Sequence, residues 1–326
     1  RWLETADSEQ TKAWSAAQAE HFAAAQASWP LRADFHSRLM ELTAGGAISV
    51  PYWRASRQFL MRRLPSQEHA VLITVDANGT ERVLVDPMEI SPDGTATLDS
   101  WQPSKEGNLL AYQISMGGSE ESTLYVMRVE TGEIIDGPIT RARYSPIAWL
   151  PGEEYFYFVR RLAPELVADD ESQYHRRVYL HKVGSNPDTD VEIFGAGLTI
   201  TNYYDVSVSR DGRWLAITAS EGTAPICEIF WADLQDSSPA TPQLEKIFGG
   251  VDAQANLGVG RDGKLYIHTD WNAPRGQICV VDPTAPSKEN WRVLIPEDSE
   301  SVLGSTITLD GPEIAEPLMV VFRSAH

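Results

Sequence analysis

Short apolar runs separated by glycine, proline and polar residues make up the chain after Gly46. This pattern is typical of β-strands bounded by turns. One strand of each set follows a tight turn, and the chain repeats this arrangement at Leu109–Tyr112, Tyr155–Phe158, Trp214–Ile217 and Leu265–Ile267. Asp211-Gly212 and Asp262-Gly263 supply the turn chemistry directly before the last two of these runs.

A later apolar strand closes each set. These closing runs are Val83–Val85, Leu124–Val129, Val178–Val183, Ile229–Leu234 and Ile278–Val281. Equivalent strands lie about 45 to 55 residues apart, which is the spacing of four-stranded propeller blades. A two-sheet sandwich, the alternative, has strands every 8 to 12 residues without the longer period. The pattern therefore predicts an all-β fold, a β-propeller of four-stranded antiparallel blades.

Five sets run from Ile48 to Val281, and a sixth begins near Ser301. In the sixth set, Leu318–Phe322 has the pattern of an inner strand, and the chain ends at His326 before an outer strand. An unfinished blade leaves strand-edge groups unpaired. We therefore expect the chain to be a fragment of a longer polypeptide.

Helix is expected only before Gly46. Residues 7–27 place Trp14, Ala17 and His21 on one stripe, with Asp7 or Ser8 as N-cap, and a second helix is expected over 34–42. The expected organisation is a helical segment over 1–46 and a propeller domain over 47–326, truncated in its sixth blade.

The acidic composition limits the partners of the chain. Its formal net charge is −19 and its pI about 4.7, which disfavours binding to nucleic acid or anionic lipid. No apolar run is long enough to span a membrane, and no leader opens the chain, so a cytoplasmic location is expected. Cys227 and Cys279 are expected to be free core residues, too few for a thiolate zinc site.

No complete catalytic site is expected in this chain. The string Gly117–Glu121 is the nearest match to a nucleophile elbow, but it lies between two expected strands and is interpreted as a hairpin loop. His175 and His181 bracket Arg176 and Arg177 in a pattern more typical of a solvated rim than of a metal site. The run Asp169–Glu171 lacks the spacing of a calcium loop, so we predict neither a metal nor a cofactor.

Arg160 and Arg161 are the most informative polar pair, because they directly follow the apolar run Tyr155–Phe158 and should emerge at one face of the propeller. Arginines in that place could bind a substrate carboxylate through paired hydrogen bonds. The alternative is a pair of surface charges that offsets nearby acids.

Several stretches resemble the prolyl oligopeptidase family of serine peptidases. They lie in order along nearly the whole chain: Arg1–Glu4 with Asp7–Thr11, Asp86-Pro87 with Ser91–Thr95, Leu110–Tyr112, Arg143–Ser145 with Ala148-Trp149, Glu221–Pro225, and Trp291–Glu297. The resemblance implies a seven-bladed propeller that caps an α/β-hydrolase domain and excludes folded proteins by size. It also implies that the Ser, Asp and His of the triad lie beyond His326, so that the α/β-hydrolase domain is absent from this chain.

The family cleaves short proline-containing peptides after proline, so the resemblance implies such peptides as substrates of the parent enzyme. In better-known members an arginine and a cysteine of one propeller loop face the active site. Their places here correspond to Ser220 and Thr223, so Arg160 or Arg161 is expected to take over the contact with a carboxylate.

Two other functions are considered. A free-standing propeller that binds a protein or small ligand should close its ring, which the expected sixth blade does not. An enzyme with its site inside the propeller channel lacks a recognisable acid, base and nucleophile set. Without the hydrolase domain, the partner would be lost by Trp14, Ala17, Phe35, Leu39 and Leu42. We therefore expect the isolated chain either to self-associate or to be captured with the missing part still bound as a separate piece.

Overall fold

The computed structural model describes residues 2–309 and 318–325, and the chain divides into two compact units. The first unit comprises residues 1–47 and 63–67 and contains η1 (Trp2–Glu4), α1 (Glu9–Gln26) and α2 (Arg32–Thr43). The Ser8 hydroxyl accepts a hydrogen bond from the Thr11 N–H at 3.1 Å and so caps α1. Both predicted helices are confirmed, and Ser8 rather than Asp7 is the cap.

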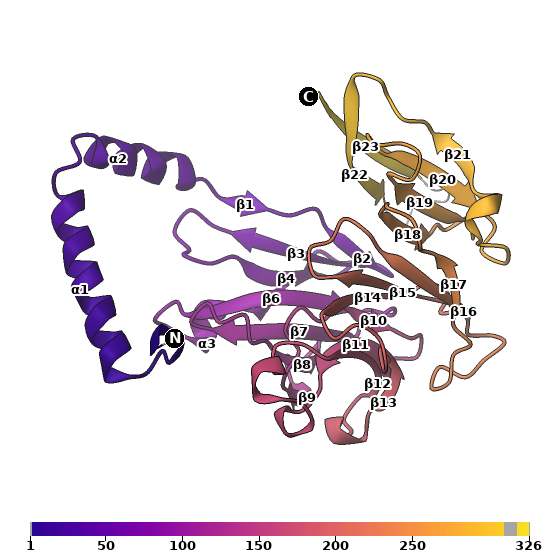
Figure 1. Cartoon of the computed structure of the whole chain (residues 1–326), viewed down its shortest axis with the longest axis horizontal. Helices are drawn as coiled ribbons and strands as arrows, with labels where there is room; N and C mark the ends of the chain where they lie inside the picture. Colours follow the sequence, from indigo (N-terminus) through magenta and orange to yellow (C-terminus); the bar gives the residue numbers. More distant parts are fainter. Residues whose placement is uncertain (1, 310–317, 326) are drawn as a thin grey trace. The chain divides into compact units, whose positions relative to one another are not determined.

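The second unit comprises residues 48–62 and 68–326 and consists of antiparallel blades (Figure 1). Five of them are complete, which confirms the predicted propeller architecture. Their strands are β1 (Ala47–Ile48), β2 (Tyr52–Arg54), β3 (Arg57–Arg63), β4 (Val71–Val75) and β5 (Glu81–Val85); β6 (Ala96–Pro103), β7 (Leu109–Met116), β8 (Thr123–Arg128) and β9 (Ile134–Ile139); β10 (Ile147–Trp149), β11 (Tyr155–Arg161), β12 (Arg176–Lys182) and β13 (Val191–Phe194); β14 (Asn202–Val208), β15 (Trp214–Glu221), β16 (Glu228–Asp233) and β17 (Glu245–Phe248); and β18 (Ala255–Val259), β19 (Leu265–Thr269), β20 (Gln277–Val281) and β21 (Arg292–Ile295).

The core of the second unit lies between consecutive blades. One apolar cluster joins the first and second blades through Phe59 and Tyr112, and another joins the second and third through Ile139 and Phe156. Two further clusters join the third blade to the fourth and the fourth to the fifth. The second, third and fourth blades therefore bury both sheet faces against their neighbours, as expected for strands that are apolar on both sides.

Two details differ from the expectation. Val83–Val85 lies in β5, the outer strand of the first blade, whereas the other closing runs lie in third strands. The expectation of helix only before Gly46 is wrong, because α3 (Pro87–Ile90) forms in the link between the first two blades. The Asp86 carboxylate accepts from the Met88 N–H at 2.9 Å, and Pro87 occupies the first turn, where its missing N–H costs nothing.

Short 3₁₀ turns also interrupt the connections of the third and fifth blades. They are η2 (Pro164–Leu166), η3 (Asp169–Glu171), η4 (Pro187–Thr189) and η5 (Lys288–Asn290). After the fifth blade, β22 (Ser301–Leu309) and β23 (Leu318–Ala325) form a two-stranded antiparallel hairpin. The predicted inner strand Leu318–Phe322 is part of β23.

Cys227 and Cys279 are free and buried in the core between the fourth and fifth blades, as predicted. The Cys227 Sγ accepts a hydrogen bond from the Ala255 N–H at 3.2 Å. Burial raises the pKa of both thiols, so they are protonated at neutral pH. Both cysteines are therefore structural and not nucleophilic.

No helix among the described residues has the length and apolar character to cross a membrane.

Candidate functional site

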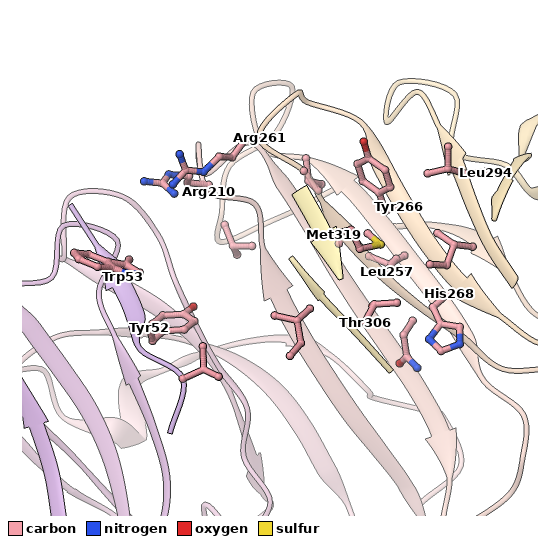
Figure 2. Close-up of a pocket in the computed structure, with 18 of the residues that line it drawn as sticks. Tyr52, Trp53, Arg210, Leu257, Arg261, Tyr266, His268, Leu294, Thr306 and Met319 are labelled. Carbon is pink, nitrogen blue, oxygen red and sulfur yellow. The ribbon is translucent and has the colours of Figure 1, made fainter. Parts of the chain in front are cut away.

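The second unit contains a cavity of about 880 Å³ (Figure 2). Part of its wall comes from β2 of the first blade, from β14 and β18, which are the first strands of the fourth and fifth blades, and from the hairpin β22–β23. Tyr52 and Trp53 lie on one side, opposite Leu257, Thr306 and Met319 (Figure 2). Strands β2, β14 and β18 thus bring residues that are far apart in the sequence to one cavity.

The wall on the side of the fifth blade is largely apolar and aromatic. Leu257, Tyr266 and Leu294 contribute to this character, and His268 lies on the same side of the cavity (Figure 2). Burial lowers the pKa of His268, so its ring is neutral at physiological pH. An apolar cavity with few polar groups is typical of sites that bind small organic molecules and peptides.

One end of the cavity is cationic. Lys105, in the turn between β6 and β7, donates from Nζ to the backbone carbonyls of Val208 at 2.7 Å and Ser209 at 2.9 Å. Burial, together with repulsion from Arg54 and Arg210, lowers the pKa of Lys105 to about 8. This lysine therefore ties the second blade to the fourth beside the cavity.

Arg160 and Arg161 lie at the end of β11, and both side chains are buried rather than emerging freely at a face. Arg160 donates to the carbonyls of Thr140 at 3.2 Å and Pro187 at 3.0 Å, and its ion pair with Asp188 spans 3.6 Å. Arg161 contacts the Glu121 carboxylate and donates to the Ser172 carbonyl at 3.2 Å. Both guanidinium groups thus offset acids, as in the alternative considered for them, but from buried positions.

Ser220 and Thr223 lie on the fourth blade, where β15 ends and its loop begins. Ser220 is half-buried and pairs in register with Tyr203 of β14, whereas Thr223 is exposed. No hydrogen bond among the described residues joins Ser220 or Thr223 to Arg160 or Arg161. Ser220 and Thr223 therefore form one group of predicted residues, and Arg160 and Arg161 form a second, separate group.

A second pair of residues links the two groups, and sequence reasoning missed it. Arg176, the first residue of β12, pairs in register with Arg161, and its Cζ lies 3.8 Å from the centroid of the Tyr203 ring. Tyr203 is in turn the register partner of Ser220. The sequence marks Arg176 only as the neighbour of another arginine, and its partner Tyr203 lies in the next blade.

The expectation of a solvated rim around His175 and His181 is wrong. Arg176 and Arg177 are buried, and His181 is fully buried between two carboxylates. The His181 Nε2 lies 2.8 Å from Asp136 of β9, and its Nδ1 lies 2.6 Å from Asp190, which precedes β13. No group of histidine, cysteine, aspartate and glutamate that could hold a metal occurs within residues 2–309 and 318–325.

The hydrogen-bonded histidines of the second unit have partners other than a nucleophile. His69 contacts the Gly94 carbonyl at 3.1 Å, and His175 contacts the Glu171 carboxylate at 2.7 Å. The string Gly117–Glu121 forms the loop between β7 and β8, which confirms the hairpin interpretation. A serine activated by a histidine is therefore not found among these groups.

Comparison with known families gives a match over residues 1–313 to the model of the prolyl oligopeptidase N-terminal β-propeller domain. The prolyl endopeptidase of Elizabethkingia miricola is 30% identical over 303 residues, which are 92% of this chain and 42% of that protein. The prolyl endopeptidase of Elizabethkingia meningoseptica is 29% identical over 300 residues, with the same coverage of 92% and 42%. This chain thus spans less than half the length of these relatives.

Solved structures show the same fold. A structure from a study of two prolyl endopeptidases superposes with a TM-score of 0.83 at 28% identity, covering 95% of this chain and 45% of that chain. Prolyl oligopeptidase B from Galerina marginata, bound to a 35-residue hydrolysis and macrocyclization substrate, superposes with a TM-score of 0.76 at 21% identity. That match covers 94% of this chain and 45% of the other.

Proposed function

Because the chain belongs to the family of prolyl oligopeptidase N-terminal β-propeller domains, we propose that it is the substrate-gating part of a serine peptidase that cleaves short peptides after proline. The family match over residues 1–313 carries this proposal. The cavity of about 880 Å³ supports it, because a space of this size accommodates a short peptide and not a folded domain.

Under this proposal the chain is not catalytic by itself. The Ser, Asp and His of the triad belong to an α/β-hydrolase domain in the same polypeptide, which is the first partner of the propeller. Proline-containing peptides are the second partner. The two free cysteines are in keeping with a reducing compartment, so we place the protein in the cytoplasm.

Self-association is proposed for the chain without its hydrolase domain. Trp14, Phe35, Leu39 and Leu42 are exposed, with accessible fractions of 45% to 63%. Each such side chain contributes about 1.5 to 3 kcal/mol when it is buried. Light scattering on the chain alone reports this association directly.

Ser220 and Thr223 are proposed to contact substrate, since Thr223 is exposed and Ser220 is partly so. Arg160 and Arg161 are each held by a carboxylate and by backbone carbonyls. We therefore propose that these two arginines shape the substrate-facing loops, Arg160 through Pro187 and Arg161 through Ser172.

The proposal is tested with a chromogenic proline substrate. The chain alone should leave it intact, because nucleophile, base and oxyanion donors are needed together. The polypeptide that contains this chain with a hydrolase domain should hydrolyse it. Turnover by the chain alone that scales with its concentration through a further purification step would contradict the proposal. Peptide binding by a source protein without a hydrolase domain would favour the free-standing binding module instead.

A further inference from the structure

Arg176 stands out because two of its guanidinium nitrogens have no partner. The residue is only 3% exposed, and neither Nε nor Nη1 makes a hydrogen bond among the described residues. Leaving a buried donor unsatisfied costs about 1 to 3 kcal/mol, and more when the group is charged. Such a cost points to a ligand that would satisfy these nitrogens.

A single aromatic ring covers the guanidinium group of Arg176. The Tyr203 ring lies over it, with the Arg176 Cζ 3.8 Å from the ring centroid, and Tyr203 itself is 37% exposed. Tyr144 adds a second ring, whose centroid lies 6.1 Å from that of Tyr203. An exposed side chain changes rotamer on the picosecond to nanosecond timescale, so Tyr203 is a movable cover and not a fixed wall.

The charges around Arg176 are not balanced. Arg143 lies 2.7 Å from the Glu120 carboxylate, and Arg161 contacts that of Glu121, so both neighbouring arginines have an acidic partner. Burial lowers the pKa of Arg176, and repulsion from Arg161 and Arg143 also lowers it, whereas the electrostatic interaction and the side-chain hydrogen bond with Tyr203 raise it. An anion at Arg176 would therefore relieve both the repulsion and the unsatisfied donors.

The neighbouring surface limits the kind of anion. A pocket of about 590 Å³ shares Tyr144 and Glu120 with this cluster and is also lined by Asp99 and Asp205. These carboxylates repel a dianion such as phosphate about twice as strongly as a monoanion, which favours a single carboxylate on an otherwise neutral molecule. Arginine also matches the planar geometry of a carboxylate.

We propose that Arg176, covered by Tyr203, binds the C-terminal carboxylate of a short peptide. This inference rests on the proposed function for its ligand class, because a propeller that admits short peptides receives molecules whose terminal carboxylate is their main negative charge. It places the carboxylate contact on Arg176, which has no acidic partner, and not on Arg160 or Arg161.

The test measures binding of two probes to the full 326-residue chain by calorimetry. The probes are the acetylated tripeptide Ac-Ala-Gly-Pro with a free carboxylate and the same tripeptide with a C-terminal amide. The acid should bind about tenfold more tightly than the amide, the difference expected for one charge-assisted contact. Arg176→Met should reduce the affinity for the acid to that for the amide.

Arg128→Met is the matched control, because it removes the same charge from an exposed residue whose ion pair with Glu133 spans 3.6 Å. It should preserve the tenfold preference. Equal affinities of the unsubstituted chain for acid and amide would overturn the proposal. An equal loss of the preference for the acid in Arg176→Met and Arg128→Met would also overturn it.

A third variant keeps the proposal falsifiable if Arg176→Met does not fold. Tyr203→Ala removes the cover and should increase the preference for the acid, so an unchanged preference would also contradict the proposal. These binding measurements need no cleavage. The preference for the acid can therefore be absent while the complete polypeptide hydrolyses proline substrates, and it can be present while that hydrolysis is absent.

Discussion

At the scale of single residues, His181 is the charged group on which the junction of the second and third blades most depends. Burial would lower the pKa of His181, but hydrogen bonds to Asp136 and Asp190 raise it to about 9. Asp136 also accepts from the Gly184 N–H at 2.6 Å and the Gly137 N–H at 2.7 Å. At neutral pH the imidazolium therefore pairs inside the core with Asp136, a buried carboxylate that also accepts two backbone hydrogen bonds.

Replacing this histidine should strongly destabilise the propeller. His181→Leu leaves the Asp136 and Asp190 carboxylates buried without a cation, which should reduce the free energy of unfolding by about 3 to 5 kcal/mol. His69→Leu is the control, since His69 is half-buried and makes one contact, at 3.1 Å, to the Gly94 carbonyl. Urea denaturation compares the two variants, and equal losses would contradict the assigned role of His181.

The contacts of His181 with Asp136 and Asp190 also make the stability of the folded chain depend on pH. The pKa of His181 rises from 6.5 in the unfolded chain to about 9 in the folded one, so the folded state binds the proton more tightly. The stabilisation is complete below about pH 6.5 and is lost as the pH rises through about 9. The unsubstituted chain should lose stability over this window more steeply than His181→Leu.

None of these residue environments could be predicted from the sequence. Arg161 and His181 owe their burial to Glu121 and Asp136, which lie 40 and 45 positions earlier in the chain. A stretch such as His175–His181, with two histidines and two arginines, has the same composition whether its polar side chains face solvent or a neighbouring blade. The expected solvated rim failed for this reason, and Arg176 was overlooked for the same one.

At the scale of elements, two equivalent turns offer a matched comparison. Gly212 and Gly263 both have positive φ, of 79° and 73°, and their N–H groups close similar turns. A Cβ at Gly212 would collide with the Pro151 ring of the preceding blade, whereas a Cβ at Gly263 would meet open space.

Both alanine variants should lose about 1 to 2 kcal/mol, because a Cβ is strained at positive φ. Gly212→Ala should lose about 1 to 3 kcal/mol more, because the overlap with Pro151 forces the two blades apart. Thermal and urea unfolding of the two variants measure this difference. Identical losses would show that Pro151 does not hold the fourth blade against the third.

Element prediction succeeded where local chemistry decides the structure. Asp-Gly turns and apolar strands are local signals, and β15 and β19 begin within two residues of Gly212 and Gly263. The strands of the first blade were harder to predict, because β1 and β2 contain only two and three residues. For this reason Val83–Val85 was assigned to the wrong strand position. The single turn of α3 depends on a cap at Asp86 that the strand pattern conceals.

At the scale of the whole molecule, the period of the strands was sufficient to predict the architecture, because each blade repeats one supersecondary unit. The cavity was not predictable in the same way. Its lining comes from β2, from β14, from the fifth blade and from the hairpin β22–β23, and the sequence does not show which of their residues face one another. The cavity is therefore a property of the assembled blades and not of any one motif.

The central claim is that this propeller admits short peptides and excludes folded proteins. It is tested most directly by the cleavage rates of substrates that carry one identical proline sequence, from a tripeptide to a loop of a folded domain. The enzyme is the polypeptide that contains this chain with a hydrolase domain. The account predicts rapid cleavage of the short peptides and no cleavage of the folded domain, with cleavage restored when that loop is supplied as a free peptide. Cleavage of the folded domain at the rate of the tripeptide would contradict it.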